Sequence, residues 1–151
     1  MRCVRKPRKS NLAESGLFCS AYTCEKRIEM MIVKNYVAAS EIHGVGLFAG
    51  ESIEKDQLIY ILDSKVDLVM NAEQIGSLGE EFARFMNIYA FQEVNTGEII
   101  ISLDNSRFMN HCAFPNTLWT YFYGWAARDI RQGEELTCDY YTFWHEPPIR
   151  A

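Results

Sequence analysis

Short apolar segments, broken at close intervals by turn-forming residues, constrain the fold of this chain more than any other feature. The segments are rich in β-branched and aromatic residues, and Gly, Asn, Asp and Ser separate them. Such a pattern is typical of many short β-strands. A doubly wound nucleotide-binding fold needs strands that alternate with helices, and this pattern excludes it. Gly44-Val45-Gly46 is therefore no dinucleotide fingerprint, because the third glycine and the following helix are missing.

The pattern predicts a mainly β chain with no internal repeat. Turns are expected at residues 40–43, 95–97 and 129–133, where small and polar residues gather. The predicted strands are residues 30–39, 57–62, 65–70, 88–94, 98–103, 118–128 and 135–141.

Helical periodicity occurs once, after residue 70. Asn71 is a suitable N-cap, and Gln74 stands three residues later, as in a capping box. Apolar residues then recur at spacings of three and four, which predicts one helix; they are Ile75, Leu78, Phe82, Phe85, Met86 and Tyr89. The glycines at positions 76 and 79 weaken this prediction or move the start of the helix towards Glu80.

Length and composition predict one globular domain. The chain has 151 residues, of which 48% are apolar, so it can bury a sizeable core. No segment is long and apolar enough to cross a membrane, and no signal-peptide pattern precedes the strands, so we expect a soluble intracellular protein.

The net charge of −5 is unevenly distributed. The first ten residues carry five positive charges and no acid, so the remainder has 10 basic against 20 acidic residues, a net charge of −10. An acidic body favours a cationic partner and repels nucleic acid. Solubility alone also explains the acidity.

The five cysteines do not indicate a metal site or a disulfide framework. Their number is odd and no Cys-x-x-Cys pair occurs, so we predict no metal and mostly free thiols, with Cys112 and Cys138 packed near the core.

Three motifs in a fixed order carry most of the functional information. They are HGVGLFA at residues 43–49, NSRFMNHCAFPN at 105–116 and GEELTCDYY at 133–141, with the aromatic segment FWHEPP after them. In this order they resemble the SET domain of protein lysine methyltransferases, over roughly residues 31–144. The resemblance implies a β-clip fold of several short sheets, with one short helical insert and a knot-like threading of the C-terminal motif. It places a SET domain at 30–146, with a tail at 147–151. The lack of clear periodicity and the basic residues before it predict an N-terminal extension at 1–29.

The resemblance implies that S-adenosylmethionine is the cofactor and methyl donor. The glycine loop would let its backbone approach the donor, and Asn110 with His111 would hold it through backbone and the Asn amide. Pro115 and Asn116 would fix the turn that follows. The implied cofactor-binding residues are Gly44, Val45, Gly46, Arg107, Phe108, Asn110, His111 and Trp144.

Tyr140 matches the catalytic tyrosine of the family. Methyl transfer to an amine is an in-line displacement that needs alignment and a neutral lysine. Aromatic walls suit the stem and cationic head of lysine. The implied lysine channel comprises Tyr89, Trp119, Cys138 and Phe143, with Phe91, Tyr121 and Trp144 as further aromatic candidates.

Two departures from the family pattern stand out. Cys112 replaces the serine of the Asn-His-Ser motif, and no cysteine follows Cys138, so the zinc modules that flank many SET domains are not expected. Trp144 is expected to close over the cofactor, as in compact members of the family.

The predicted activity is methyl transfer to a lysine of a basic protein or peptide, with a histone-like protein as a candidate substrate, by a monomer or homodimer. Each residue taken singly also fits a structural role, so a catalytically silent SET module that binds a peptide stays open. Residues 1–10 suit a nucleic-acid contact, and Lys6 or Lys9 in the Arg-Lys-Ser context suits automethylation.

Overall fold

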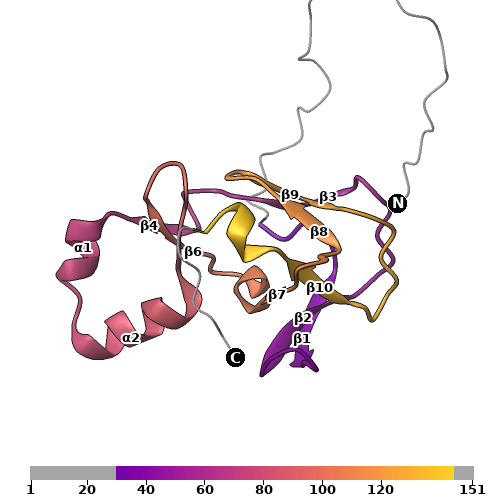
Figure 1. The fold of residues 1–151 in the computed structure, drawn as a ribbon, viewed down its shortest axis with the longest axis horizontal. Helices are drawn as coiled ribbons and strands as arrows, with labels where there is room; N and C mark the ends of the chain where they lie inside the picture. The colour runs from indigo at the N-terminus through magenta and orange to yellow at the C-terminus, as the bar shows by residue number, and fades with distance from the viewer. Residues whose placement is uncertain (1–29, 145–151) are drawn as a thin grey trace, which may run out of the picture.

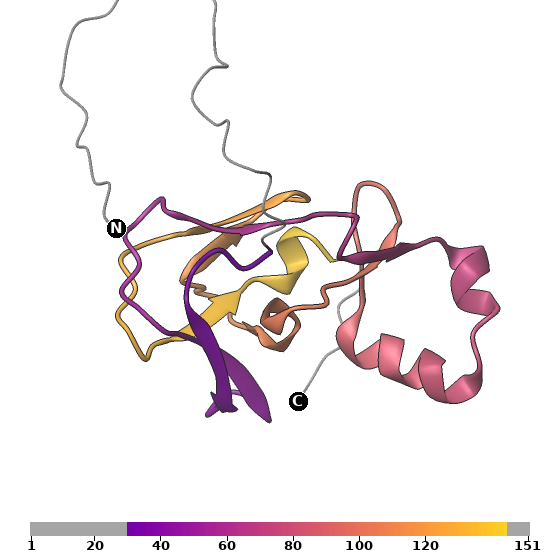
Figure 2. The ribbon, with the colours of Figure 1, turned by 180° about the vertical axis from the view of Figure 1, so that it is seen from behind.

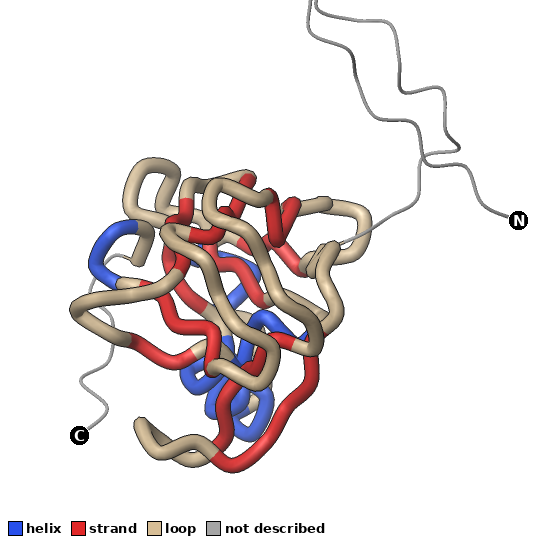
Figure 3. Tube along the Cα trace, turned by 90° about the vertical axis from the view of Figure 1, so that its right-hand side faces the viewer, coloured by secondary structure: helices blue, strands red, loops and turns tan. Residues whose placement is uncertain are grey.

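The computed structural model describes residues 30–144, which fold into three small sheets and two α-helices. Two short 3-10 helices, η1 (Asn105–Phe108) and η2 (Tyr140–Thr142), complete the described part of the chain. The sheets have the strand orders β1-β2-β10-β7, β3-β9-β8 and β4-β6-β5. The prediction of a mainly β fold with several short sheets is confirmed, and Figure 3 shows that long loops connect the short strands. The strands are β1 (Asn35–Ala39), β2 (Val45–Ala49), β3 (Leu58–Ile61), β4 (Leu68–Met70), β5 (Phe91–Gln92), β6 (Ile99–Ile101), β7 (Asn110–His111), β8 (Thr117–Trp119), β9 (Tyr123–Ala126) and β10 (Glu135–Cys138).

The first sheet joins the three sequence motifs. β1 and β2 form an antiparallel hairpin, which the Ser40 N–H closes by donating to the Gly44 carbonyl at 3.1 Å. β10 pairs antiparallel with β2 and parallel with β7, with Thr137 opposite Asn110. Residues from the second and third motifs therefore lie side by side, in keeping with the threading that the resemblance implies.

The predicted strand at 118–128 is two strands. β8 and β9 pair antiparallel, and the Thr120 N–H donates to the Tyr123 carbonyl at 2.8 Å across the turn. Gly124 allows this hairpin to close, because a Cβ there would lie 3.2 Å from the Trp119 ring. The continuous aromatic pattern concealed the turn, since it contains no proline and its glycine lies within β9.

The helical insert is two short helices, and the prediction of one is wrong. α1 (Ala72–Gly76) has the predicted capping box between Asn71 and Gln74, and α2 (Glu80–Tyr89) begins where the glycines were expected to move the start. Between them the Ser77 N–H bonds back to the Gln74 and Ile75 carbonyls and ends the first helix. The two helices and the β4-β6-β5 sheet form one end of the molecule (Figures 1 and 2).

Two apolar clusters hold these parts together. The larger lies among the first two sheets and includes Leu47, Ile59, Ile130 and Leu136, each at most 1% exposed. The smaller packs α2 on β6 through Met86, Ala90 and Ile101. In residues 30–144, no helix is long and apolar enough to cross a membrane.

Candidate active site

The glycine loop and the second motif enclose a cleft of about 250 Å³. Gly44 has a φ of +52° and no neighbour within 4 Å of the position of a Cβ, so its backbone is open to the cleft. The described wall consists of His43, Gly44, Val45, Ile88, Tyr89, Arg107, Phe108, Met109, Asn110 and Tyr140.

The side-chain amide of Asn110 fastens the glycine loop. Its Nδ2 donates to the carbonyls of His43 at 3.2 Å and Val45 at 3.1 Å, and it also lies 2.9 Å from Glu135 Oε1 and 3.1 Å from Ser40 Oγ. Asn110 is 5% exposed, so this amide is largely removed from solvent. Hydrogen bonds from one side chain of the second motif therefore tie the glycine loop to β7 and β10.

Glu135 is the second fastening of the loop, and sequence reasoning assigned it no role. Its carboxylate accepts from Ser40 Oγ at 2.9 Å and from Asn110. A Cβ on Gly46 would lie 2.2 Å from Glu135 Oε1, so only glycine leaves room for this carboxylate. The second glycine of the loop thus makes space for the protein's own side chain and does not line the cleft.

Tyr140 stands between the cleft and a second cavity. Its hydroxyl donates to the Met109 carbonyl at 2.7 Å, and its backbone N–H donates to His111 Nδ1 at 3.2 Å. The ring contacts His111, Phe143 and Trp144. The side chain is 9% exposed and so is fixed on several sides.

The second cavity, of about 60 Å³, is rich in aromatic residues. The Trp119 ring makes tilted contacts with the rings of Tyr60 and Phe143, and its indole N–H donates to Thr117 Oγ1 at 2.7 Å, which fixes the ring. The described lining comprises Tyr60, Leu62, Ile88, Tyr89, Phe91, Glu93, Ser102, Ser106, Arg107, Met109, Trp119, Thr120, Tyr121, Cys138, Tyr140, Phe143 and Trp144.

Three carboxylates lie in or behind this aromatic wall. Asp67 accepts a hydrogen bond from the Tyr60 hydroxyl, and burial raises the pKa of Asp67. Burial also raises the pKa of Glu93, but hydrogen bonds from Thr96 and Asn95 outweigh it and leave that pKa lowered. Glu98 accepts from the Tyr121 hydroxyl at 2.5 Å, and this bond raises the pKa of Tyr121 to about 12. Of these carboxylates Glu93 lines the cavity itself, together with the guanidinium of Arg107.

Most of the predicted site residues gather at the two cavities. Gly44, Val45, Phe108 and Asn110 line the cleft, Trp119, Cys138 and Phe143 line the aromatic cavity, and Tyr89, Arg107 and Tyr140 line both. Trp144, predicted for the cofactor, lines the aromatic cavity, with its ring 5.0 Å from that of Tyr140. Gly46 and His111 line neither cavity.

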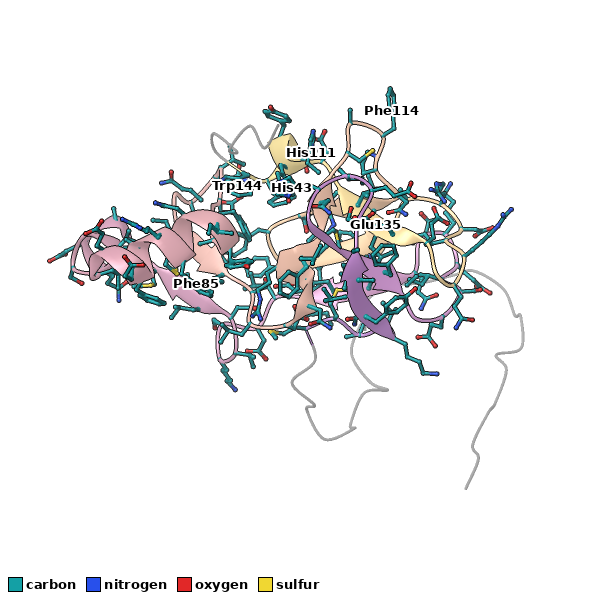
Figure 4. The ribbon with its side chains drawn as sticks, turned by 90° about the horizontal axis from the view of Figure 1, so that it is seen from below. His43, Phe85, His111, Phe114, Glu135 and Trp144 are labelled. Atoms are coloured by element: carbon teal, nitrogen blue, oxygen red, sulfur yellow. The ribbon has the colours of Figure 1, made fainter. Side chains whose placement is uncertain are left out.

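Other features of the sequence lie apart from the cavities. Phe114 projects from its loop, 92% exposed, and Phe85 lies on the outer part of α2 (Figure 4). Cys138 is buried and Cys112 half-buried, both as free thiols. The predictions for residues 1–10, Lys6, Lys9 and the tail at 147–151 lie outside the described residues.

Sequence reasoning missed His43, Ile88 and Met109 in the cleft and Tyr60, Ser102 and Glu93 in the aromatic cavity. Met109 and His43 belong to or border the motifs, so their neighbours gave a signal. Tyr60, Ser102 and Glu93 lie on separate strands or loops without a motif, and only the folded chain brings them together.

The match to known proteins agrees with this geometry. The family model of the SET domain matches residues 44–141, and the chain belongs to the SET domain family. No curated protein matches the sequence at a significant level.

Many solved structures resemble the fold, and two of them serve as examples. One is a humanized mutant of Polycomb Repressive Complex 2 from Chaetomium thermophilum, bound to an inhibitor, with 20% identity and a TM-score of 0.58 over 76% of this chain. The other is a putative histone methyltransferase from Plasmodium falciparum, with 19% identity and a TM-score of 0.51 over 75% of this chain. The match covers 16% of the first structure's chain and 95% of the second's. At these identities the likeness shows the fold.

Proposed function

We propose that this protein is an S-adenosylmethionine-dependent protein-lysine N-methyltransferase. One observation carries the proposal: the cleft under the glycine loop and the aromatic cavity share a wall that includes Tyr140, Met109 and Tyr89. A transferase for two substrates needs two pockets that meet at the reacting atoms, so that donor and acceptor are held in line.

The cleft has groups that fit S-adenosylmethionine. Gly44 offers accessible backbone, Phe108 and Tyr89 offer aromatic surface, and the guanidinium of Arg107, 4.9 Å above the Phe108 ring, offers a positive charge for a carboxylate. When bound, the cofactor supplies an electrophilic methyl group on a sulfonium. Asn110 keeps the loop in place over it.

The aromatic cavity would take the lysine side chain. Trp119 and Phe143 would surround the aliphatic stem, and the carbonyl and hydroxyl oxygens at Met109 and Tyr140 would orient the amine. Exclusion of water by Trp144 and Phe91 would favour the neutral amine that the displacement needs.

The substrate class follows from charge and from the family. An acidic body and a cavity with Glu93 in its wall favour a basic protein or peptide. One structural neighbour is a putative histone methyltransferase, which supports a histone-like substrate and an intracellular site of action, in cytoplasm or nucleus.

The test is calorimetric titration of S-adenosylmethionine, together with transfer of labelled methyl groups to a mixture of core histones. Tyr140→Phe removes the hydroxyl at the shared wall and should lower kcat by about 10²-fold while the cofactor still binds. Tyr141→Phe is the matched control, because that ring is 66% exposed and lines neither cavity. Wild-type protein that binds no cofactor would refute the proposal. Binding without transfer would leave a catalytically silent SET module.

A further inference from the structure

Two of the hydroxyl-bearing residues that line the second cavity, Tyr60 and Ser102, are hydrogen-bonded to each other. Tyr60 comes from β3 and Ser102 directly follows β6, and their oxygens lie 3.1 Å apart. The Tyr60 hydroxyl also donates to Asp67 Oδ2 at 3.0 Å. A hydrogen-bonded chain therefore runs from the cavity wall to a carboxylate behind it.

Asp67 is an unusual end to such a chain. It is 3% exposed, and its Oδ1 has no hydrogen-bond partner, although the Leu103 backbone lies nearby. The Asp63 N–H donates to its other oxygen at 3.1 Å, and the charged group that faces it is another acid, Asp104. Among residues 30–144 it has no ion pair. A role confined to packing does not explain a buried carboxylate that lacks a cation.

The proposed methyl transfer leaves one proton without an acceptor. A lysine arrives protonated, because its ordinary pKa is about 10.4. The amine attacks only after it has lost a proton. Tyr140 is poorly placed to take that proton, since its hydroxyl already donates to the Met109 carbonyl in a buried position.

We propose that Asp67 accepts the proton of the target ammonium through Tyr60 and Ser102, which makes Asp67 a positioning and proton-accepting group of this site. The inference rests on the proposed methyltransferase function. An N–H bond of the ammonium breaks as its proton passes to the Ser102 hydroxyl, Ser102 gives its own hydroxyl proton to the Tyr60 oxygen, and Tyr60 gives its proton to Asp67 Oδ2. Both hydroxyls end neutral, and the amine keeps the electron pair. That pair then forms the new C–N bond while the C–S bond to the sulfonium breaks, leaving a neutral thioether.

The ionisation of the chain suits this direction of transfer. Burial, with the nearby charge of Asp104, raises the pKa of Asp67 despite the hydrogen bonds that it accepts, so it takes up a proton more readily than an exposed aspartate. Burial also raises the pKa of Tyr60, so this phenol stays protonated and passes a proton on as it receives one.

The other carboxylates at the cavity are less suited to the role. Both oxygens of Glu93 accept hydrogen bonds, from Asn95 and Thr96, and its pKa is lowered. Glu98 is bonded to Tyr121, which is only half-buried and lies at the more exposed turn between β8 and β9.

Asp67→Asn tests the proposal, because the amide keeps the shape and can still accept from Tyr60. We expect kcat at pH 7 to fall by about 10²–10³-fold. The rate of the variant should then rise about tenfold per pH unit towards the pKa of lysine, as free amine forms without help. With a peptide that contains thialysine, whose amine is less basic, the loss of kcat in Asp67→Asn should be smaller. Affinity for S-adenosylmethionine should be unchanged.

Asp63→Asn is the matched control, since that carboxylate lies beside the chain but does not bond to Tyr60 or Ser102. It should keep the wild-type pH profile. If Asp67→Asn does not fold, Ser102→Ala and Tyr60→Phe, which interrupt the chain and keep the carboxylate, should show the same rise with pH. A defect that is equal at every pH, or no defect, would overturn the inference alone. A wild-type protein that transfers no methyl group at any pH would overturn both proposals.

Discussion

Gly46 shows how a single position can serve the site without touching a ligand. Its missing side chain leaves room for the Glu135 carboxylate, which in turn holds Ser40 and Asn110. The family resemblance pointed to this glycine for close approach to the cofactor. The structure gives a different reason, which is that the glycine leaves room for another side chain of the same protein. The motif alone does not indicate this, because that carboxylate lies 89 positions later in the sequence.

Gly46→Ala should therefore loosen the loop. The added Cβ would meet Glu135 Oε1 at 2.2 Å and Ser40 Cβ at 3.1 Å, so the carboxylate must move and the contacts to Asn110 weaken. We expect a loss of about 1–3 kcal/mol in the free energy of unfolding, with weaker binding of S-adenosylmethionine in calorimetry. Gly76→Ala is the control, because nothing lies within 4 Å of its Cβ position. Equal effects of the two substitutions would contradict this account.

The ion pair between Arg128 and Glu134 is a second feature of single residues. Arg128 is the main cause that lowers the pKa of Glu134, with added hydrogen bonds from Arg131 and Asn116. A lowered pKa in the folded state means that the stabilisation is present above the ordinary value of 4.5 and is lost as the pH falls through the folded value.

Arg128→Met should thus destabilise the protein at pH 7 and hardly at all at strongly acidic pH. Because the Arg128 side chain is 55% exposed, we expect only about 0.5 kcal/mol at neutral pH. Urea denaturation of both proteins at pH 7 and near pH 3 measures the difference. If the two proteins differed as much in free energy of unfolding near pH 3 as at pH 7, Arg128 would act through packing.

Among the elements, local signals predicted some features and failed on others for physical reasons. The capping box at Asn71 and Gln74 and the hairpin turn at Gly97 depend on adjacent residues, and both are present. The division of the helical insert and of the strand at 118–128 depends on packing. Trp119 lies over Gly124, and the last turn of α1 closes at Ser77. Neither contact can be predicted from the spacing of apolar residues along the sequence.

The N-terminus of α2 offers a prediction at this scale. Gly79 is its N-cap, with extended backbone at φ −65° and no side-chain hydrogen bond, and its Cβ position is open. Gly79→Ser should supply a cap and raise the free energy of unfolding by about 0.5–1 kcal/mol. Methyl transfer should stay unchanged, because Gly79 lines neither cavity. A lower melting temperature of Gly79→Ser in calorimetry would contradict this prediction. Ser77→Ala serves as a comparison variant in the same linker between the helices.

At the scale of the whole molecule, the pairing of β7 with β10 makes the two cavities one site. β7 contributes Asn110 to the cleft, and β10 leads to Tyr140 through Cys138 in the aromatic cavity. The order of the motifs predicted that these segments cooperate. The order of the motifs could not predict which contacts hold the segments together, because these are side-chain hydrogen bonds between residues about twenty positions apart.

Asn116 is one of the residues that fasten the segment after β7 to β10, and its substitution should affect both cavities at once. It is 2% exposed; its Nδ2 donates to the Glu135 carbonyl at 2.7 Å, and its Oδ1 accepts from the Thr137 N–H at 2.8 Å. Asn116→Ala leaves both backbone groups of β10 without partners, at a cost of about 2–4 kcal/mol in the free energy of unfolding.

Because β10 carries residues of the aromatic cavity and holds Glu135 against the glycine loop, Asn116→Ala should weaken the binding of S-adenosylmethionine and lower kcat together. Both are measured at a temperature where circular dichroism shows the variant folded. Leu118→Ala, on the neighbouring strand and 55% exposed, should change neither. If Asn116→Ala lowered kcat and left cofactor binding intact, the two cavities would be held in place independently. The parallel pairing of β7 with β10 would then not be what couples the donor site to the acceptor site.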